Sequence, residues 1–272
     1  MGLRVNTNIT SLTAQRNLGS VTGRLQGNFA RLSSGLRIAT AADDAAGLGI
    51  SERMRSQIRS YSAAARNAQD GISLVQTAEG ALNEASNILG RMRELAVQSA
   101  NGTLSTADRT TINDEVTALS AELDRIAGST EFNGVALLDG TTATAAIQVG
   151  IGATETIDVN LQDTTTATLG VDTVAVDTAA NANTAIGLID TAIDTVNSAR
   201  GALGASQNRL TSAYTSIQSA RENLSSAESR IRDVDVAYET ADMTRNSILQ
   251  QAAVSVLSQA NVQPQLALRL LG

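Results

Sequence analysis

The sequence predicts a mainly α-helical fold: long antiparallel coiled-coil helices formed by the N- and C-terminal regions, with a small β-hairpin region in the middle. Apolar residues recur at every seventh position along two long runs that contain no proline. Aromatic residues make up only 2% of the chain against 42% hydrophobic residues, so small aliphatic side chains must do the packing, which suits closely packed helices. Between the two runs, a stretch rich in Thr, Gly and Val loses the helical pattern.

The two heptad runs predict two helices of unusual length. At 1.5 Å per residue each helix would be roughly 70–85 Å long, whereas helices of ordinary globular proteins usually have about 8–20 residues. Length therefore favours a coiled coil over a helix buried in a globule. The first run is Met54, Tyr61, Ala68, Val75, Leu82, Leu89 and Ala96, and the second is Ile189, Val196, Leu203, Leu210, Ile217, Leu224, Ile231 and Tyr238.

A shorter helix is expected between these two. Ser105 and Asp108 form a plausible capping pair at its start. Gly128 is a plausible stop signal. Apolar residues between these signals are spaced by four and three positions: Ile112, Val116, Leu119, Leu123 and Ile126.

The middle of the chain predicts a β-hairpin. Asn133-Gly134 and Asp139-Gly140 are turn signals. Apolar residues alternate in "AIQVGI" at 146–151 and again in "TIDVNL" at 156–161, and "GATE" joins the two runs. This region has few large side chains, so we expect it to lean on the helices.

Both ends of the chain read as amphipathic helices, and the simplest arrangement pairs them with each other and pairs the two long helices likewise. Gly19, Gly23 and Gly27 lie four apart on one face of the first helix, which indicates either tolerated flexibility or the close approach of a neighbouring helix. The last eight residues, "QLALRLLG", place four leucines on several sides of a short helix. That pattern predicts a chain end surrounded by partners.

Composition excludes several classes of protein. The net charge of −7 makes a nucleic-acid partner unexpected. The absence of His, Cys and Lys removes the usual Ser–His, Cys–His, Schiff-base and zinc chemistry, so that only carboxylates remain as catalysts. Asp43 and Asp44 form such a carboxylate pair, but Thr40 precedes them and favours a helix start. We therefore expect no catalytic residue, no cofactor and no metal, and we see neither a Sec signal nor a membrane span.

Four longer motifs resemble those of bacterial flagellins. They are "LSSGLRIATAADDAAGLGIS" at 32–51, "RMRELAVQSANGT" at 91–103, "EFNGVALLDG" at 131–140 and "SILQQAAVSVLSQANVQPQLALRLLG" at 247–272. The resemblance covers roughly 1–140 and 180–272, and the middle matches only the short β-element of minimal flagellins. The large outer domains of longer flagellins have no room here.

The resemblance implies a structural subunit, not an enzyme, that self-assembles into the bacterial flagellar filament for swimming motility. It implies that residues 1–42 pair with 233–272 as an inner coiled-coil domain. Residues 43–135 and 178–232 would form a helical outer-tube domain, with 136–177 as its short β-hairpin element. The flagellar type III secretion system would export the chain uncleaved, to a secreted, extracellular filament. The alternative is a hook–filament junction protein of the same superfamily.

The resemblance also implies partners and sites. The partners are other copies of the chain, a flagellar export chaperone, the filament cap and the hook–filament junction protein, with no nucleic acid and no membrane. Self-assembly is assigned to apolar residues of the two ends: Val5, Ile9, Leu12, Leu25, Phe29, Leu32, Leu249, Val256, Leu257, Leu266, Leu268, Leu270 and Leu271.

The stretch "RMRELAVQ" at 91–98 has two interpretations. It is a solvated helix face that contacts the next subunit, or, as in flagellins that animal hosts detect, it binds the host Toll-like receptor for flagellin. One face can serve both roles. The residues of this candidate innate-receptor face are Arg91, Glu94, Leu95, Gln98 and Glu115.

Overall fold

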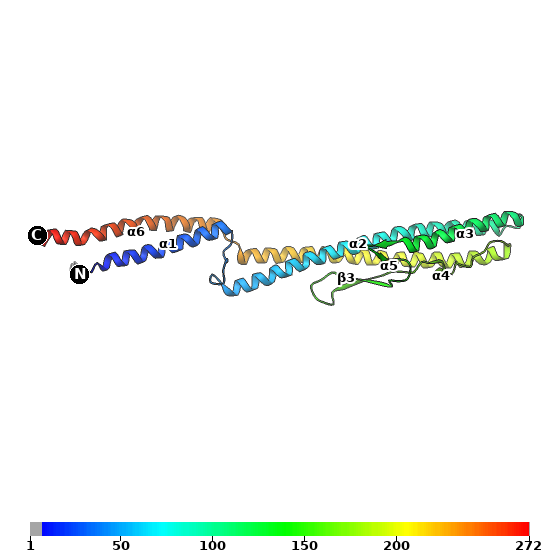
Figure 1. Ribbon diagram of the computed structural model, residues 1–272, viewed down its shortest axis with the longest axis horizontal. Coiled ribbons are helices and arrows are strands. Elements are labelled where there is room, and N and C mark those ends of the chain that lie inside the picture. Colours follow the sequence, from blue (N-terminus) through cyan, green and yellow to red (C-terminus); the bar gives the residue numbers. More distant parts are fainter. Residues whose placement is uncertain (1–6, 272) are drawn as a thin grey trace. The chain divides into compact units, whose positions relative to one another are not determined.

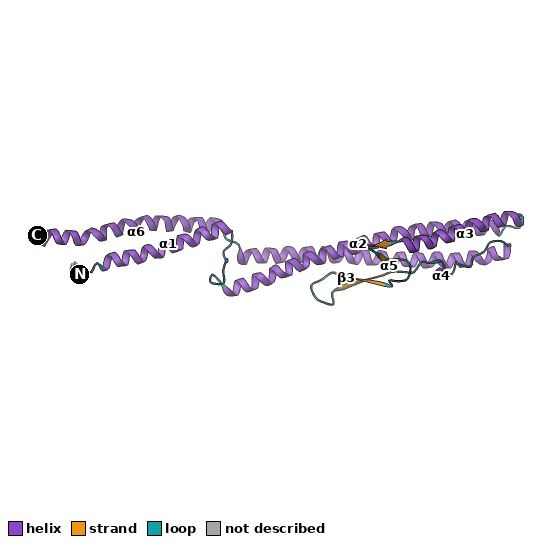
Figure 2. Cartoon of the chain, viewed as in Figure 1, coloured by secondary structure: helices purple, strands orange, loops and turns teal. Residues whose placement is uncertain are grey.

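The computed structural model describes the backbone of residues 7–271 and the side chains of residues 7–263. Helices dominate the chain, and the strands are short and confined to its middle (Figure 2). The contacts divide the chain into two compact units: one combines the two ends, up to Ser56 and from Asn223, and the other is Gln57–Glu222. The predicted mainly α-helical fold with a β-hairpin region is confirmed.

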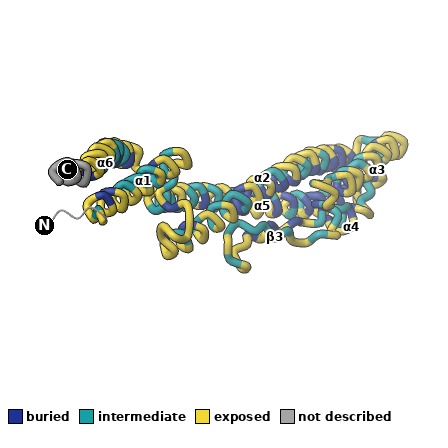
Figure 3. Tube along the Cα trace, turned by 60° about the vertical axis from the view of Figure 1, so that its left-hand side comes forward, coloured by how far each residue is buried: buried dark blue, intermediate teal, exposed yellow. Residues whose placement is uncertain are grey.

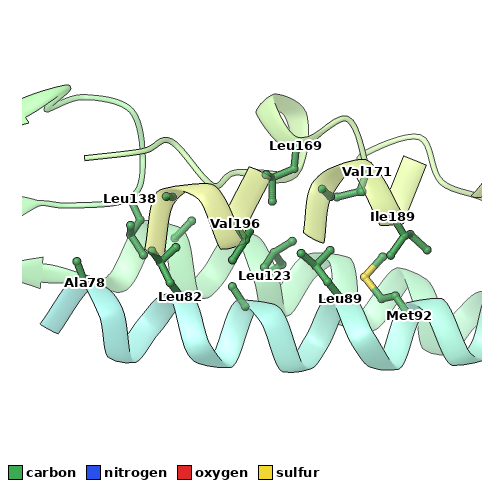
Figure 4. Close-up of a cluster of buried hydrophobic side chains, with 14 of the residues drawn as sticks. Ala78, Leu82, Leu89, Met92, Leu123, Leu138, Leu169, Val171, Ile189 and Val196 are labelled. Atoms are coloured by element: carbon green, nitrogen blue, oxygen red, sulfur yellow. The ribbon is translucent and has the colours of Figure 1, made fainter. Parts of the chain in front are cut away.

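Two long helices build the unit Gln57–Glu222. Helix α2 spans Ala45–Ser99 and has 55 residues, and helix α5 spans Ala179–Arg232 and has 54. Their heptad side chains share one buried cluster, in which Leu82, Leu89, Ile189 and Val196 are fully buried (Figure 4). The predicted pairing of the two long helices is confirmed, because each supplies the large aliphatic side chains that cover the other.

Helix α3, Thr106–Ser129, covers the same cluster with Ile112, Val116 and Leu123. The predicted capping pair is present: the Ser105 hydroxyl accepts from the Asp108 N–H at 3.3 Å, and the Asp108 carboxylate accepts from the Ser105 N–H at 3.1 Å. The predicted stop at Gly128 is wrong by one residue. The helix runs through Ser129, and Thr130 closes it by donating its N–H to the carbonyl of Ile126.

Two small antiparallel hairpins follow. Strands β1, Glu131–Phe132, and β2, Val135–Ala136, are joined by Asn133-Gly134. Both joining residues have positive φ, 52° and 77°, which this two-residue turn requires. Strands β3, Thr144–Gln148, and β4, Thr156–Asn160, pair with Ile147 opposite Ile157.

The connection between β3 and β4 is longer than predicted. The predicted first strand continued through Val149 to Ile151, but β3 ends at Gln148. The Gln148 amide donates to the carbonyls of Gly150 and Gly152 at 3.0 and 2.6 Å, which holds the chain in a loop instead of a strand. The hairpin leans on the helices as expected, because Ile157 and Val159 of β4 belong to the large buried cluster. The one-turn helix α4, Thr166–Leu169, adds Leu169 to the same cluster.

The two ends of the chain form an antiparallel helix pair, as predicted. Helix α1 spans Ile9–Ser34 and helix α6 spans Val236–Leu271, and they lie side by side (Figure 1). The Asn8 amide donates to the carbonyl of Ala260 at 2.8 Å, and the Gln250 amide donates to the Thr22 hydroxyl at 3.4 Å. A methyl group added to Gly19, Gly23 or Gly27 would meet no atom within 4 Å among the described residues. The close approach that these glycines suggested is therefore not made by α6.

The segment that follows α1 is irregular and is fastened to the end of α5. Gly35 closes α1 with φ 72°, a left-handed conformation that glycine adopts readily. The Arg37 N–H donates to the carbonyl of Arg232 at 2.7 Å, and its guanidinium donates to that of Ile231 at 2.6 Å. These bonds satisfy carbonyls at the end of α5 that no helical partner can reach.

The acidic pair at the start of α2 has a structural explanation. Asp44 precedes the first helical residue and accepts the Gly47 N–H at 2.9 Å, as an N-cap does. Asp43 accepts both the N–H and the hydroxyl of Thr40 at 2.9 Å. We expected the two acids inside the first turn of the helix, but both precede it. Their contacts are otherwise consistent with a role at the helix start.

Candidate functional site

Helices α1 and α6 carry most of the exposed apolar surface of the described chain. Figure 3 shows exposed residues along both helices, whereas buried residues gather on α2, α3 and α5. A concentration of exposed apolar side chains on one helix pair is typical of an interaction surface. We call this set the outer apolar surface: Ile9, Leu12, Phe29, Val236, Tyr238, Ile248, Leu249, Val254, Val256 and Val262.

A different set of residues lies between α1 and α6, and we call it the terminal seam. Its members are buried or half-buried and follow heptad spacing on both helices. Several of them are small or polar, and the larger apolar members are half-buried and not fully enclosed. The terminal seam consists of Ser11, Ala14, Leu18, Val21, Leu25, Asn28 and Leu32 on α1, and of Glu239, Met243, Asn246, Gln250, Ala253, Leu257 and Ala260 on α6.

The residues assigned to self-assembly fall into three groups. Those in the outer apolar surface are Ile9, Leu12, Phe29, Leu249 and Val256, with exposed fractions between 44% and 62%. Those in the terminal seam are Leu25, Leu32 and Leu257, which are half-buried within the subunit. Those outside the described residues or side chains are Val5, Leu266, Leu268, Leu270 and Leu271.

A buried polar cluster interrupts the terminal seam, and sequence reasoning missed it. We define this polar cluster as Asn28, Glu239, Asp242 and Asn246. The Asn28 amide donates to the carboxylates of Glu239 and Asp242 at 2.6 and 3.2 Å. The Asn246 amide donates to the Asn28 carbonyl oxygen at 2.8 Å and to Asp242 at 3.0 Å. The available signal was an Asn on each helix at a heptad position otherwise held by apolar residues.

The surface around Arg91 joins α2 to α3. The Arg91 guanidinium donates to Glu115 of α3 at 2.9 and 3.1 Å and to Glu94 at 3.2 Å. These hydrogen bonds, first the one to Glu115, raise the pKa of the Arg91 guanidinium. Gln98 is exposed beside them. The structure thus brings four of the five candidate receptor residues together on one exposed surface.

Leu95 is the exception. Its side chain is only 2% exposed and belongs to the large buried cluster, so the expectation that it shares the exposed face is wrong. Spacing alone places residues 91, 95 and 98 on neighbouring positions of a helix, but α3 and α5 both cover α2 and narrow its exposed face.

Asp43 of the carboxylate pair is not arranged as a general acid, and Asp44 caps α2. Hydrogen bonds from Thr40 hold the pKa of Asp43 below its usual range, whereas an acid catalyst at neutral pH needs a raised pKa. Within the part of the chain that the structure describes, no three His, Cys, Asp or Glu side chains gather as a metal site would require. Across the same residues, no helix is sufficiently long and apolar to traverse a lipid bilayer.

Comparisons with known proteins agree with the sequence motifs. The family model described as bacterial flagellin N-terminal helical region matches residues 5–143, and the model described as bacterial flagellin C-terminal helical region matches residues 186–271. The chain is similar to the flagellin of Halalkalibacterium halodurans, with 48% identity over 98% of this chain and 99% of that protein. It is 46% identical to the flagellin of Bacillus subtilis over 99% of this chain and 100% of that protein. Among solved structures, the crystal structure of Bacillus cereus flagellin matches with a TM-score of 0.52 and 38% identity, over 56% of this chain and 88% of that one.

Proposed function

The chain belongs to the bacterial flagellin family, and we propose that it is the structural subunit of a flagellar filament whose copies pack through the outer apolar surface of α1 and α6. Relatives named flagellin match it from end to end, so the hook–filament junction alternative is not favoured. Flagellins form a family of structural proteins, which agrees with a role other than catalysis.

The outer apolar surface is the observation that supports this packing most directly. Full burial of a large aliphatic or aromatic side chain is worth about 1.5–3 kcal/mol. Ile9, Phe29 and Val256 each keep more than half of that surface in water within one subunit. A pair of helices that is apolar on its outside as well as its inside is typical of a protein core, and neighbouring copies would supply that core.

We propose the same roles for the domains that the sequence suggested. Residues 1–42 and 233–272 would form the inner coiled-coil domain, and their apolar sides would face copies of themselves. Residues 43–135 and 178–232 would form the outer tube, with 136–177 as its hairpin element. The exposed charges of that unit, such as the Arg93–Asp190 pair with its 2.5 Å contact, suit a surface that meets water or polar neighbours.

The outer apolar surface also bears on how the chain is exported and on which partners it meets. Before assembly, a chain with so much exposed apolar surface needs a partner that covers it, which is the task of an export chaperone. We propose that the flagellar type III system exports the chain uncleaved to the cell exterior. There the filament cap would receive it, and the hook–filament junction protein would hold the first subunits.

For the exposed surface around Arg91 we propose recognition by the Toll-like receptor for flagellin. Arg91, Glu94, Gln98 and Glu115 present a fixed set of charges and an amide, because Arg91 ties both carboxylates together. Leu95 would support this surface from inside the subunit without touching the receptor.

Electron microscopy of the purified full-length chain tests the main proposal. After seeding with filament fragments or addition of a precipitating salt, we expect long helical tubes. Monomers alone would contradict a filament subunit, and short rings that do not elongate would favour the junction protein.

A further inference from the structure

We propose that the polar cluster of Asn28, Glu239, Asp242 and Asn246 sets the register in which α1 and α6 pair. Buried amides in a coiled coil are known to specify alignment at some cost in stability. Here the proposal rests on the contacts within one chain. Only its consequence, that a single register produces a uniform assembly surface, rests on the proposed function.

The aliphatic members of the terminal seam specify alignment poorly. They include Ala14, Ala253 and Ala260, and leucines and a valine of similar size. The heptad spacing repeats every seven residues, so a slide of one helix by seven positions keeps every member in the seam. Aliphatic packing alone would therefore tolerate several alignments, because no large and distinctive side chain is locked into a matching space.

The amide N–H groups of the polar cluster are all hydrogen-bonded in the observed register. Asn28 and Asn246 are each only 3% exposed, and each uses both of its N–H groups. Glu239 is 5% exposed and also lies 3.6 Å from the guanidinium of Arg31. Buried polar groups of this kind are costly when a partner is removed.

A slide by seven residues breaks these bonds in either direction. In one direction Asn246 would take the position of Ala253 and lose Asn28. In the other direction Ala253 would take the position of Asn246, and Asn28 would lose both carboxylates. Each alternative leaves an amide or a carboxylate in the seam without its partner, so the cluster penalises a seven-residue slide in either direction. The hydrogen bonds from Ser11 to Asn261 and from Gln250 to Thr22 act in the same sense, but they lie in more exposed surroundings.

The outer apolar surface gives the register a consequence. Ile9, Leu12 and Phe29 lie on α1, whereas Leu249 and Val256 lie on α6. A slide of seven residues moves the α6 members by about 10 Å relative to those on α1. Subunits in different registers would then present different surfaces to their neighbours.

Cysteine cross-linking in assembled filaments tests the register, because the chain contains no cysteine. Thr22→Cys with Gln250→Cys reports the observed register, since these two side chains are in contact. Thr22→Cys with Leu257→Cys, and Thr22→Cys with Met243→Cys, report slides of seven residues in the two directions. In the otherwise natural sequence we expect the first pair to cross-link at least tenfold more than either of the others.

The test variant makes the seam uniformly aliphatic with Asn28→Leu, Glu239→Leu and Asn246→Leu. We expect the ratio of native to shifted cross-links to fall at least tenfold. Two controls accompany it: Glu239→Gln, which keeps an oxygen acceptor for Asn28, and Leu25→Met, which changes a neighbouring seam residue at nearly constant volume. Both are expected to keep the ratio within twofold of the natural sequence.

An unchanged ratio in the triple variant would overturn the proposal. If the triple variant does not pellet, far-UV circular dichroism decides. Undiminished helix content would support misaligned pairing, because a more apolar seam still pairs, whereas a loss of helix content would overturn the register role and leave only a stabilising one. Pelleting of the unsubstituted chain tests the proposed function by itself. A failure of the filament proposal can therefore be distinguished from a failure of the register proposal.

Discussion

Replacing four residues of the outer apolar surface should weaken assembly without affecting the folded unit Gln57–Glu222, which we call the outer unit. The perturbation is Ile9→Ser, Phe29→Ser, Leu249→Ser and Val256→Ser in one chain. The exposed fractions of the four side chains are 62%, 56%, 44% and 58%. Because full burial is worth about 1.5–3 kcal/mol per side chain, burial of the exposed half contributes about 1 kcal/mol each, or ~4 kcal/mol in total.

That magnitude predicts a large change in the concentration at which filaments form. A free energy of 1.4 kcal/mol corresponds to about a tenfold change in an equilibrium constant, so the critical concentration should rise by about three orders of magnitude. Sedimentation of seeded samples across a concentration series measures it. None of the four side chains belongs to the large buried cluster, so thermal unfolding of the outer unit by circular dichroism should stay unchanged.

A matched control uses the same helices and the same replacement residue. Gln15→Ser, Gln26→Ser, Gln251→Ser and Gln259→Ser also introduce four serines into exposed positions of α1 and α6. They cause a similar loss of helix propensity but remove no apolar side chain. The reasoning is refuted if the variant without the four apolar side chains forms filaments at the same critical concentration as the control with four replaced glutamines.

Three further predictions concern α2, α3 and α5. Leu89→Ala should lower the free energy of unfolding by about 2–5 kcal/mol, because the side chain is fully buried, whereas Val97→Ala on the same helix, 49% exposed, should change it by less than about 0.5 kcal/mol in urea titrations. Arg91→Ala with Glu115→Gln should abolish signalling by the monomer in a receptor reporter cell, while Arg125→Ala should not; full signalling by the double variant would leave this surface without a receptor role. Hydrogen bonds from Arg93, Ser105 and Arg232 lower the pKa values of Asp190, Asp108 and Glu52, respectively. The contribution of these three carboxylates to folding stability is complete above their unfolded-state pKa values of about 4. It is lost as the pH falls through their lowered pKa values in the folded state. Urea unfolding from pH 2 to 9 should therefore be flat above about pH 5, and a steep loss between pH 6 and 7 would contradict it, since the chain has no His.

The long helices were predictable because heptad spacing and side-chain size indicate the same structure. Leu82 and Leu89 lie seven residues apart on α2, and Ile189 and Val196 lie seven apart on α5. All four side chains are large, aliphatic and fully buried. The capping pair of Ser105 and Asp108 was predictable for a similar reason, since its hydrogen bonds depend only on residues three apart.

The errors occurred where a side-chain contact that residue spacing does not reveal decides the local structure. The end of β3 depends on the Gln148 side chain, which bonds to two loop carbonyls. The burial of Leu95 depends on the helices that pack around α2. Glu239 reads in the sequence as an exposed acid, yet it is buried against Asn28, which lies more than two hundred residues earlier in the chain.

The candidate site was predictable in its chemistry but not in its details. Amphipathic ends rich in Leu, Ile and Val indicated assembly, whereas the sequence did not separate residues that pack within the subunit from those left exposed. Leu25 and Phe29 illustrate this, because both are large and apolar and lie one helical turn apart. Leu25 occupies the terminal seam, and Phe29 remains 56% exposed. Only the position of α6 decides between them.

The two helix pairs use one heptad pattern but bury their large apolar side chains to different extents. In α2 and α5 the largest aliphatic side chains lie inside, such as Leu89 and Leu210, so that this unit is stabilised by its own packing. In α1 and α6 the terminal seam holds Ala14, Asn28 and Asn246 beside leucines that are only half-buried, while Ile9, Phe29 and Val256 lie outside it. We therefore expect neighbouring copies to supply part of the stabilisation of the second pair, which would then depend on protein concentration. It follows that core substitutions should appear in the unfolding of the single chain, whereas substitutions of the outer apolar surface should appear only in the equilibrium between chain and filament.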